Sequence, residues 1–245
     1  MQPLMHELAS SYVQRQKHVD FEFSSVGSTA GIEALRRGIA DVALVSTWLD
    51  SADLAKAEGG KEALLSTAVG RDAVAIIVNA RNPLAGISSY QLRAIYEGSV
   101  SSWQQLDPAQ AEEAIVVVSR EDGSGTRATF EAQAMRGHRV TPTSVVMPGS
   151  EAVRDYVASH EGAIGYLSIG WLSPGIKAIT IDGQEPGQPS FQSGTYPLTR
   201  PFNLVYRSTS NSEILAFVHF VSSPAGQSIV KRRYGGSAGG SSELD

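Results

Sequence analysis

The chain has 245 residues, of which 42% are hydrophobic and 18% are charged, as in ordinary globular proteins. Its formal net charge of -5 disfavours non-specific nucleic-acid binding, which needs a basic surface, but leaves local binding of a small anion open. The absence of cysteine excludes disulfides, thiolate metal sites and thiol nucleophiles. No run is long and apolar enough to cross a bilayer, and no signal segment opens the chain. We therefore expect a cytoplasmic protein, or the mature or truncated form of an exported one.

The first part of the chain alternates helical and strand patterns. Apolar residues at helical spacing open it, and they are Leu4, Met5, Leu8 and Tyr12. Residues 19–25 alternate apolar and polar side chains as a strand does. Residues 27–38 predict a turn and a helix that ends at Gly38. Residues 39–46 form an apolar run typical of a strand that is buried on both faces.

The same alternation continues through the rest of the chain. Residues 72–79 predict a strand. Residues 88–98 predict a helix in which Ser88 and Gln91 have capping-box spacing and Gly98 marks the end. Later segments read in order as strand, helix, strand, strand, strand and helix, at residues 144–149, 150–160, 162–172, 177–183, 203–208 and 212–223. Such alternation predicts an α/β fold with mainly parallel sheets and flanking helices.

The strongest signal for function lies between a β-branched strand at residues 116–120 and a helical pattern that follows Ser124. A strand, a turn of small residues and a helix start together direct free backbone N–H groups at an anion. Gly123 and Gly125 allow the backbone to approach a ligand closely, and Ser124 and Thr126 add hydroxyl groups. The turn lacks the lysine of a nucleotide-binding loop.

Arg120 at the end of that strand could donate two hydrogen bonds from its guanidinium to two oxygens of a tetrahedral oxyanion. Asp122, two positions on, could hold its guanidinium in place. The alternative is a well-capped helix after a tight turn, with Arg120 simply solvated. A second, weaker turn of the same kind contains Gly27, Ser28 and Thr29. Two such turns suggest that two helix N-termini face one cleft.

The sequence shows no residue pattern for a metal site or for nucleophilic catalysis. The histidines lack the spacing of metal ligands, and they are His6, His18, His138, His160 and His219. Residues 235–239 match a G-x-S-x-G pattern, but they lie in a Gly/Ser-rich tail without the strand that a nucleophile elbow requires. The sequence therefore predicts no catalytic residues, no metal and no cofactor.

The motifs in this order resemble those of the phosphate-binding proteins that deliver phosphate to ABC importers, within the periplasmic-binding-protein superfamily. The resemblance covers about residues 1–234 and is carried by residues 26–46, 82–106, 119–131, 161–172 and 220–230. The third segment is quite specific, because it matches the Arg-x-Asp-Gly-Ser-Gly-Thr signature of that family.

The resemblance implies a two-lobe fold of the type 2 class, with mainly parallel sheets, flanking helices and hinge strands that let the lobes close on the anion. Lobe 1 would contain residues 1–75 and 202–234, and lobe 2 residues 76–201. The crossings would fall near residues 73–78 and 201–205. Residues 235–245 would form a flexible tail.

The resemblance also implies ligands for phosphate. From lobe 2 they are Arg120, Ser124, Gly125 and Thr126, and from lobe 1 they are Ser28 and Ser46. Supporting positions are Gly27, Thr29, Asp122 and Met1. Asp122 corresponds to the family carboxylate that braces the arginine, and Met1 stands where the family places a backbone N–H that touches the anion.

Two departures from the family pattern affect these expectations. The family's first strand and turn, which precede the opening helix, are absent, so we expect a truncated or misassigned start, or a permuted arrangement in which that strand follows Asp245. Ser46 stands where some relatives carry aspartate and others serine. Without a carboxylate there, an obvious acceptor for the proton of hydrogen phosphate is missing, so selectivity against sulfate is open.

The leading interpretation is a non-catalytic, periplasmic or cell-surface receptor that captures phosphate between two lobes and delivers it to a membrane ABC permease. We expect it to be a monomer that does not bind nucleic acid. One alternative is a sensor or scaffold domain of the same fold with an altered ligand such as sulfate. A less favoured alternative is an enzyme that acts on phosphorylated substrates.

Overall fold

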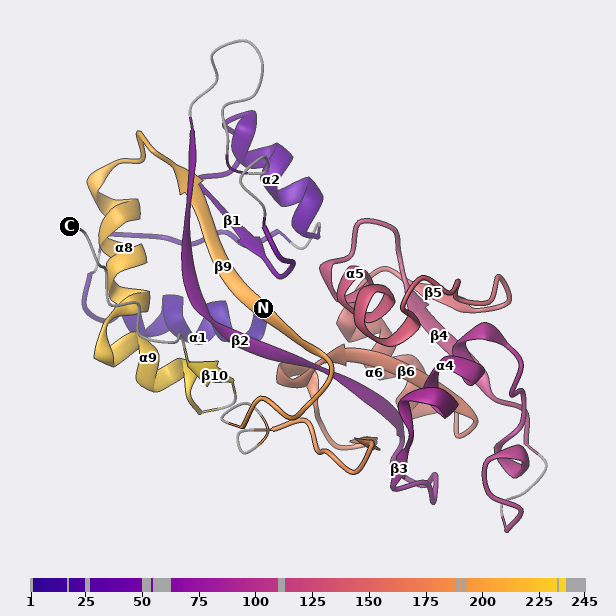
Figure 1. Cartoon of the computed structure of the whole chain (residues 1–245). Helices are drawn as coiled ribbons and strands as arrows, with labels where there is room; N and C mark the ends of the chain where they lie inside the picture. Colours follow the sequence, from indigo (N-terminus) through magenta and orange to yellow (C-terminus); the bar gives the residue numbers. More distant parts are fainter. Residues whose placement is uncertain are drawn as a thin grey trace. The chain divides into compact units, whose positions relative to one another are not determined.

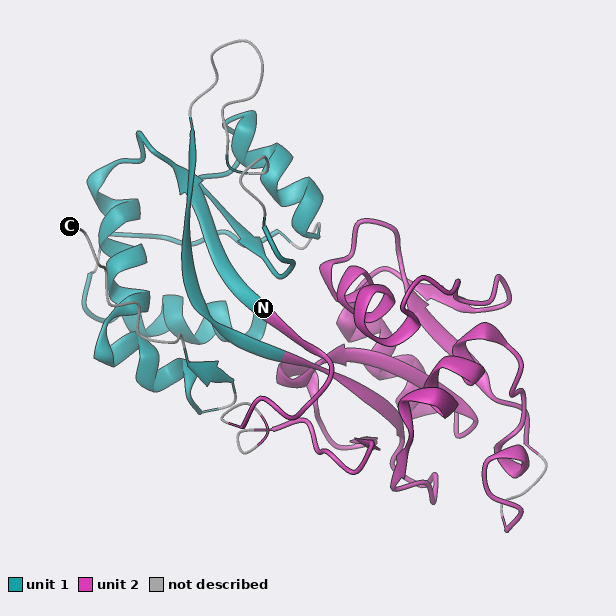
Figure 2. Cartoon of the chain, in the orientation of Figure 1, with its two compact units in different colours: residues 1–72, 201–245 teal, residues 73–200 magenta. Residues whose placement is uncertain are grey.

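A computed structural model of the chain describes residues 2–16, 18–24, 27–49, 54, 63–109, 113–187, 190, 193–232 and 234–236. The chain divides into two compact units (Figure 2). Unit 1 contains Met1–Asp72 and Pro201–Asp245, and unit 2 contains Ala73–Arg200. The divisions fall three residues before the boundary expected after residue 75 and one residue before that expected after residue 201. No helix within the described residues is long and apolar enough to span a membrane.

The described residues of unit 1 contain four helices, two complete strands and parts of two more (Figure 1). The helices are α1 (Gln2–Val13), α2 (Ser28–Arg36), α8 (Ser212–Ser222) and α9 (Pro224–Val230). The strands are β1 (Val42–Val45), the first part of β2 (Leu64–Asn79), most of β9 (Thr199–Arg207) and β10 (Gly235–Gly236). β1 pairs with β9 and β10 pairs with β2, both antiparallel. β2 and β9 are the two strands through which the chain passes between the units.

The predicted strand at residues 19–25 is wrong for the residues that the structure describes, 19–24, which run extended without strand pairing. Phe21 and Phe23 are half-buried, while Glu22 between them is exposed, so the alternation seen in the sequence is real. Phe21 packs on Phe217 of α8 at 4.7 Å between ring centroids. The apolar side chain of Phe21 thus contacts a helix, but the backbone of residues 19–24 does not pair with any strand of the described part of the chain.

Unit 2 has a sheet with helices on both faces. The second part of β2 pairs antiparallel with β6 (Ala163–Ser168) and β7 (Ile176–Ala178). Parallel pairs join β6 to β4 (Val116–Arg120), β4 to β5 (Val145–Met147), and β3 (Gly86–Ile87) to β8 (Thr180–Ile181). The helices are α4 (Ser89–Glu97), α5 (Gly125–Phe130) with a π-helical turn at Glu131–Met135, and α6 (Ser150–Ser159). The parallel pairing expected from the alternating pattern is therefore found in unit 2.

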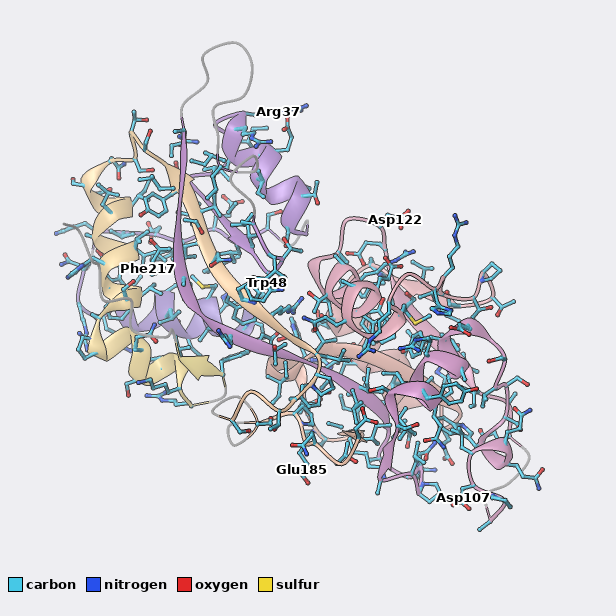
Figure 3. The ribbon with its side chains drawn as sticks, in the orientation of Figure 1. Arg37, Trp48, Asp107, Asp122, Glu185 and Phe217 are labelled. Atoms are coloured by element: carbon cyan, nitrogen blue, oxygen red, sulfur yellow. The ribbon has the colours of Figure 1, made fainter. Side chains whose placement is uncertain are left out.

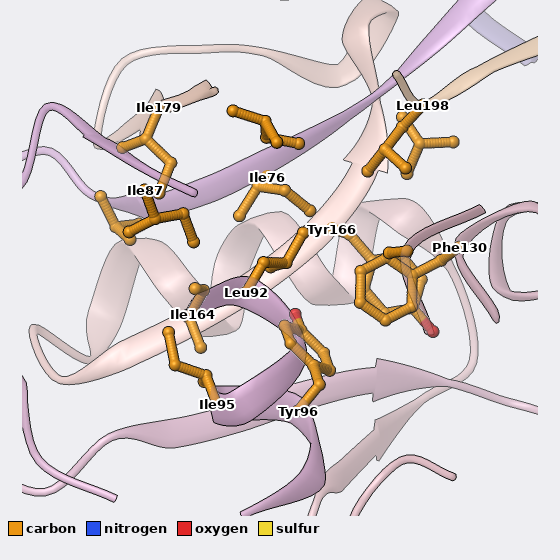
Figure 4. Packing of buried hydrophobic residues seen from close by; sticks show 14 of the residues in the cluster. Ile76, Ile87, Leu92, Ile95, Tyr96, Phe130, Ile164, Tyr166, Ile179 and Leu198 are labelled. Carbon is orange, nitrogen blue, oxygen red and sulfur yellow. The ribbon is translucent and has the colours of Figure 1, made fainter. Parts of the chain in front are cut away.

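Two layers of apolar side chains hold the sheet of unit 2 in place. Ile76 of β2 points into a cluster that includes Tyr96 of α4, Phe130 of α5 and Tyr166 of β6 (Figure 4). Phe130 and Tyr166 stack with their ring centroids 4.2 Å apart. The alternate residues of β2 face a second cluster with α6. Because both faces are covered, the start of α5 is fixed relative to the end of β4 by the core beneath it.

The ends of several elements agree with the sequence patterns. The capping box of α4 is present, because the Ser88 side chain accepts from the Gln91 backbone and the Gln91 side chain accepts from the Ser88 backbone. Gly98 closes that helix in the left-handed conformation, with φ of 86°. The predicted tail begins too early, since Gly235–Gly236 pair with Gly70 and Arg71 of β2. Residues 237–245 lie outside the described part.

Candidate functional site

The end of strand β4 places Arg120 beside the N-terminus of α5 in unit 2. Its side chain lies in the interior, and the whole residue is 8% exposed. Its Nε and Nη2 donate to the two carboxylate oxygens of Glu121, at 2.7 and 2.8 Å, and its Nη1 donates to Ser150 Oγ at 3.0 Å. A guanidinium has five N–H groups. Within the described residues three of them are used, so two are left for an oxyanion.

The backbone of Arg120 is also fixed. Its N–H donates to the Tyr166 hydroxyl at 3.2 Å, and its carbonyl accepts from Arg127 Nη1 at 2.8 Å. The Tyr166 hydroxyl in turn hydrogen-bonds Ser119 Oγ at 2.8 Å. Burial raises the pKa of Tyr166, so this hydroxyl stays protonated at neutral pH and remains able both to donate and to accept.

Asp122 does not hold Arg120 in this structure, contrary to the prediction. Its carboxylate pairs with Arg127 Nη1 at 2.9 Å, and its side chain is 96% exposed on the loop before α5 (Figure 3). Glu121 takes the expected role because it directly follows Arg120 and reaches the guanidinium with both oxygens. Arg127 is further held by Glu131, whose hydrogen bond raises the pKa of that guanidinium.

The start of α5 supplies the remaining predicted donors of unit 2. Gly123 has φ of 82°, a conformation that favours glycine, and this turn leads into Ser124 as the N-cap. The Ser124 side chain accepts from the Arg127 backbone at 3.3 Å. The first N–H groups of the helix, those of Gly125 and Thr126, have no intrahelical acceptor. Arg120, Ser124, Gly125 and Thr126 thus lie within one strand–turn–helix segment of unit 2, from the end of β4 to the first residues of α5.

The second turn lies in unit 1 and is organised differently. Gly27 precedes α2 with φ of 82°, and Ser28 is the buried first residue of the helix, whereas Thr29 is exposed. Ser28 Oγ accepts from the Ser46 backbone N–H at 3.2 Å and lies 3.5 Å from Ser46 Oγ. The two serines predicted from this unit therefore meet. Met1 lies outside the described residues.

Trp48 follows Ser46 by two positions and is an exposed aromatic side chain of unit 1, labelled in Figure 3. Its relative exposure is 67%. A large apolar side chain left so exposed, two residues from Ser46, is a feature that the sequence did not single out.

A hollow of about 260 Å³ in unit 2 contains none of the predicted site residues. Its lining residues are Arg81, Asn82, Pro83, Trp103, Ala109, Glu113 and Glu161. The charged pair at its edge, Arg81 with Glu161, is largely exposed to solvent. We therefore place the candidate site at the start of α5, which follows the buried Arg120 in the chain, and not in this hollow.

Four residues that contact the candidate site were missed by the sequence reading. They are Glu121, Ser150, Tyr166 and Arg200. Arg200 donates from Nη1 to Thr126 Oγ1 at 2.8 Å. Ser150, Tyr166 and Arg200 are distant from the motif in sequence, so no local spacing could have found them. Glu121 adjoins the motif and was overlooked in favour of Asp122. Within the described residues no group of three or more metal-ligating side chains occurs.

A family model described as the PBP superfamily domain matches residues 1–225 of the chain. The chain belongs to the PBP superfamily. A crystal structure from Clostridium perfringens, described as a substrate-binding protein of a phosphate ABC transporter with bound phosphate, is 29% identical to this chain, with a TM-score of 0.86. The matched region covers 95% of this chain and 94% of the Clostridium perfringens chain. An ABC-type phosphate transport receptor from Vibrio cholerae is 31% identical, with a TM-score of 0.70, and covers 94% and 93% respectively.

These PBP-superfamily matches confirm the predicted superfamily and its α/β fold. Among curated proteins, the phosphate-binding protein PstS of Bacillus subtilis (strain 168) is 28% identical over 204 residues, which cover 81% of this chain. The chain spans 51 to 64% of the length of the first curated relatives that it matches. These relatives are named as binding proteins rather than as enzymes.

Proposed function

We propose that this chain is a non-catalytic binding protein that captures inorganic phosphate and delivers it to an ABC permease. The observation that carries the proposal is Arg120, a buried guanidinium with two N–H groups left within the described residues, on the strand that leads into the start of α5. A buried cation beside a helix N-terminus favours an anion, because charge-assisted hydrogen bonds are strongest away from water. The names of the relatives support phosphate as that anion.

Ser28 and Ser46 of unit 1 supply the second part of the proposal. The Ser28 oxygen accepts the Ser46 backbone N–H, and the contact between the two hydroxyls uses one of their two hydrogens, so one serine hydroxyl is left to donate to an anion. We propose that both serines are phosphate ligands, as the residues at the start of α5 are, and that the permease recognises the liganded form.

The location and partner follow from the same role. A receptor that feeds a membrane permease works on the outer side of that membrane, so we propose an exported protein in the periplasm or at the cell surface. The permease is proposed from the family and not from a surface of this chain. A monomer remains the predicted oligomeric state.

Isothermal titration with phosphate, sulfate and arsenate tests the proposed function directly. We expect saturable phosphate binding with one site, and similar binding of arsenate, which has the same shape and protonation. Sulfate carries no proton near neutral pH, so tight sulfate binding with no phosphate binding would overturn phosphate as the ligand and favour the altered-ligand sensor. No binding of any oxyanion would overturn the receptor role.

A second arm of the experiment tests the enzyme alternative. The chain would be incubated with a chromogenic phosphate ester and divalent metal, and release of the chromophore would be followed. We expect none, since no group of three or more metal-ligating side chains occurs within the described residues. Turnover that disappears in Arg120→Ala would contradict the binding-protein proposal.

A further inference from the structure

Arg200 is the second buried arginine at the start of α5. It is 2% exposed and lies at the end of unit 2, as the second residue of β9. Its Nη1 donates to Thr126 Oγ1 at 2.8 Å, across a sequence separation of 74 residues. Both residues belong to unit 2. The contact therefore joins the strand by which the chain leaves the unit to a predicted phosphate ligand.

The direction of this hydrogen bond has a chemical consequence. A guanidinium has only donors, whereas a hydroxyl has one donor and two acceptor positions. The Thr126 oxygen must therefore accept from Arg200, and its single hydrogen is left to donate elsewhere. Since Thr126 is 5% exposed and its backbone N–H belongs to the free first turn of α5, that hydrogen is suited to an anion bound at the helix start.

A neighbouring contact shows that β9 is also held to the same helical segment without touching Thr126. Gln133, in the π-helical turn that continues α5, donates from Nε2 to the carbonyl of Thr199 at 2.7 Å. π-helical turns are rare and are often found near functional sites. Gln133 thus anchors the residue next to Arg200, and it provides a matched control that changes the anchoring but not the Thr126 hydroxyl.

We propose that Arg200 is a positioning residue of the oxyanion site, which fixes the Thr126 hydroxyl as a donor toward the bound anion and adds a second buried positive charge behind it. The proposal rests on the proposed function, because it assigns Thr126 to the phosphate site. It differs from the role of Arg120, which would contact the anion itself.

A double-mutant cycle tests this inference. Phosphate affinity would be measured by titration for wild type, Arg200→Gln, Thr126→Val and the double variant. We expect each single change to weaken phosphate binding by about tenfold, the loss of roughly one hydrogen bond to a charged group. The double variant should be no weaker than the weaker single variant, because both changes remove the same donated hydrogen bond. Arg200→Lys, which keeps a charge and a donor, should recover part of the affinity.

Gln133→Met is the control. It should lower the urea midpoint of unfolding while leaving phosphate affinity within about twofold, because it removes an anchor of β9 without changing the site. If Arg200→Gln binds phosphate as wild type does, or if the two single losses simply add, the inference is overturned. If Arg200→Gln does not fold, Thr126→Val decides alone, since unchanged phosphate affinity there contradicts the proposal. Failure of wild type to bind any oxyanion would instead overturn the proposed function.

Discussion

The starts of α5 and α2 use the same local sequence logic but different electrostatics. At α5, in unit 2, two buried arginines contact the turn and the first helical residues, and Glu121 orients one of them. At α2, in unit 1, the buried group is Ser28, and its contacts are with another serine, Ser46. The difference teaches that a Gly-Ser turn before a helix does not by itself supply charge. Within the described residues, buried positive charge accompanies this turn at α5, and it comes from Arg120 and Arg200, which lie outside the turn.

The largest effect that this comparison predicts is that of Arg120→Ala. Removing the guanidinium deletes two charge-assisted hydrogen bonds to the anion, each worth about 1.5 to 3 kcal/mol, so phosphate affinity should fall by at least about 100-fold. Titration calorimetry of wild type and Arg120→Ala measures this loss of phosphate affinity. Arg154→Ala is the matched control, because Arg154 sits on α6 and pairs with Glu151 and Asp155 at the surface. Retained affinity in Arg120→Ala would remove the basis of the comparison.

A smaller effect is expected from the serine site of unit 1. Ser28→Ala removes one donor to the anion and the acceptor for the Ser46 N–H, so phosphate affinity should fall by about tenfold. Ser24→Ala, at an exposed position before the same turn, should leave affinity unchanged. A loss for Ser28→Ala that exceeds the loss for Arg120→Ala would reverse the ranking of the two helix starts.

The roles of the two adjacent carboxylates can be separated by stability. Glu121→Gln leaves the buried Arg120 guanidinium without its charged partner and should lower the free energy of unfolding by about 1 to 3 kcal/mol. Asp122→Asn removes only an exposed pair with Arg127 and should cost less than about 1 kcal/mol. Urea unfolding of both variants without phosphate gives the two values. An equal cost would mean that Asp122 supports the site as strongly as Glu121 does.

The smallest effect concerns the layer beneath α5. Burial raises the pKa of Tyr166 above its ordinary value, so the unfolded chain releases this proton at lower pH than the folded chain does. Its contribution to stability is therefore complete below a pH of about 10 and is lost as the pH rises beyond it. Urea unfolding at a series of alkaline pH values should show a decline that is shallower in Tyr166→Phe. Parallel declines in both proteins would contradict this assignment.

Much of the fold could be predicted because it depends on local patterns. The capping box at Ser88 and Gln91, and the left-handed Gly98, need only neighbouring residues to form. The segment 19–24 was predicted as a strand because its side chains alternate, yet pairing depends on a partner strand that no local pattern reveals. The pairing of Gly235–Gly236 was missed for a similar reason, since a Gly/Ser-rich composition says nothing of the distant Gly70 that it meets.

In the candidate site, too, the contiguous residues could be predicted and the distant ones could not. The turn, its glycines and the helix start are contiguous with Arg120, so the strand–turn–helix segment that contains them could be predicted from the sequence. The assignment of Asp122 as the brace failed because Glu121 and Asp122 both lie within reach of an arginine, and only the backbone direction decides between them. Arg200 and Tyr166 reach the site through strands β9 and β6, and their roles depend on tertiary packing alone.

The exposed indole of Trp48 gives the protein a built-in optical signal. Unit 1 contains no other tryptophan, and the remaining two, Trp103 and Trp171, belong to unit 2. Trp103 is 1% exposed and Trp171 is half-buried, so a soluble quencher such as iodide should act most strongly on the emission of Trp48. The quenchable fraction of the fluorescence would then follow the surroundings of the Ser46 segment, while a Trp48→Phe variant supplies the blank.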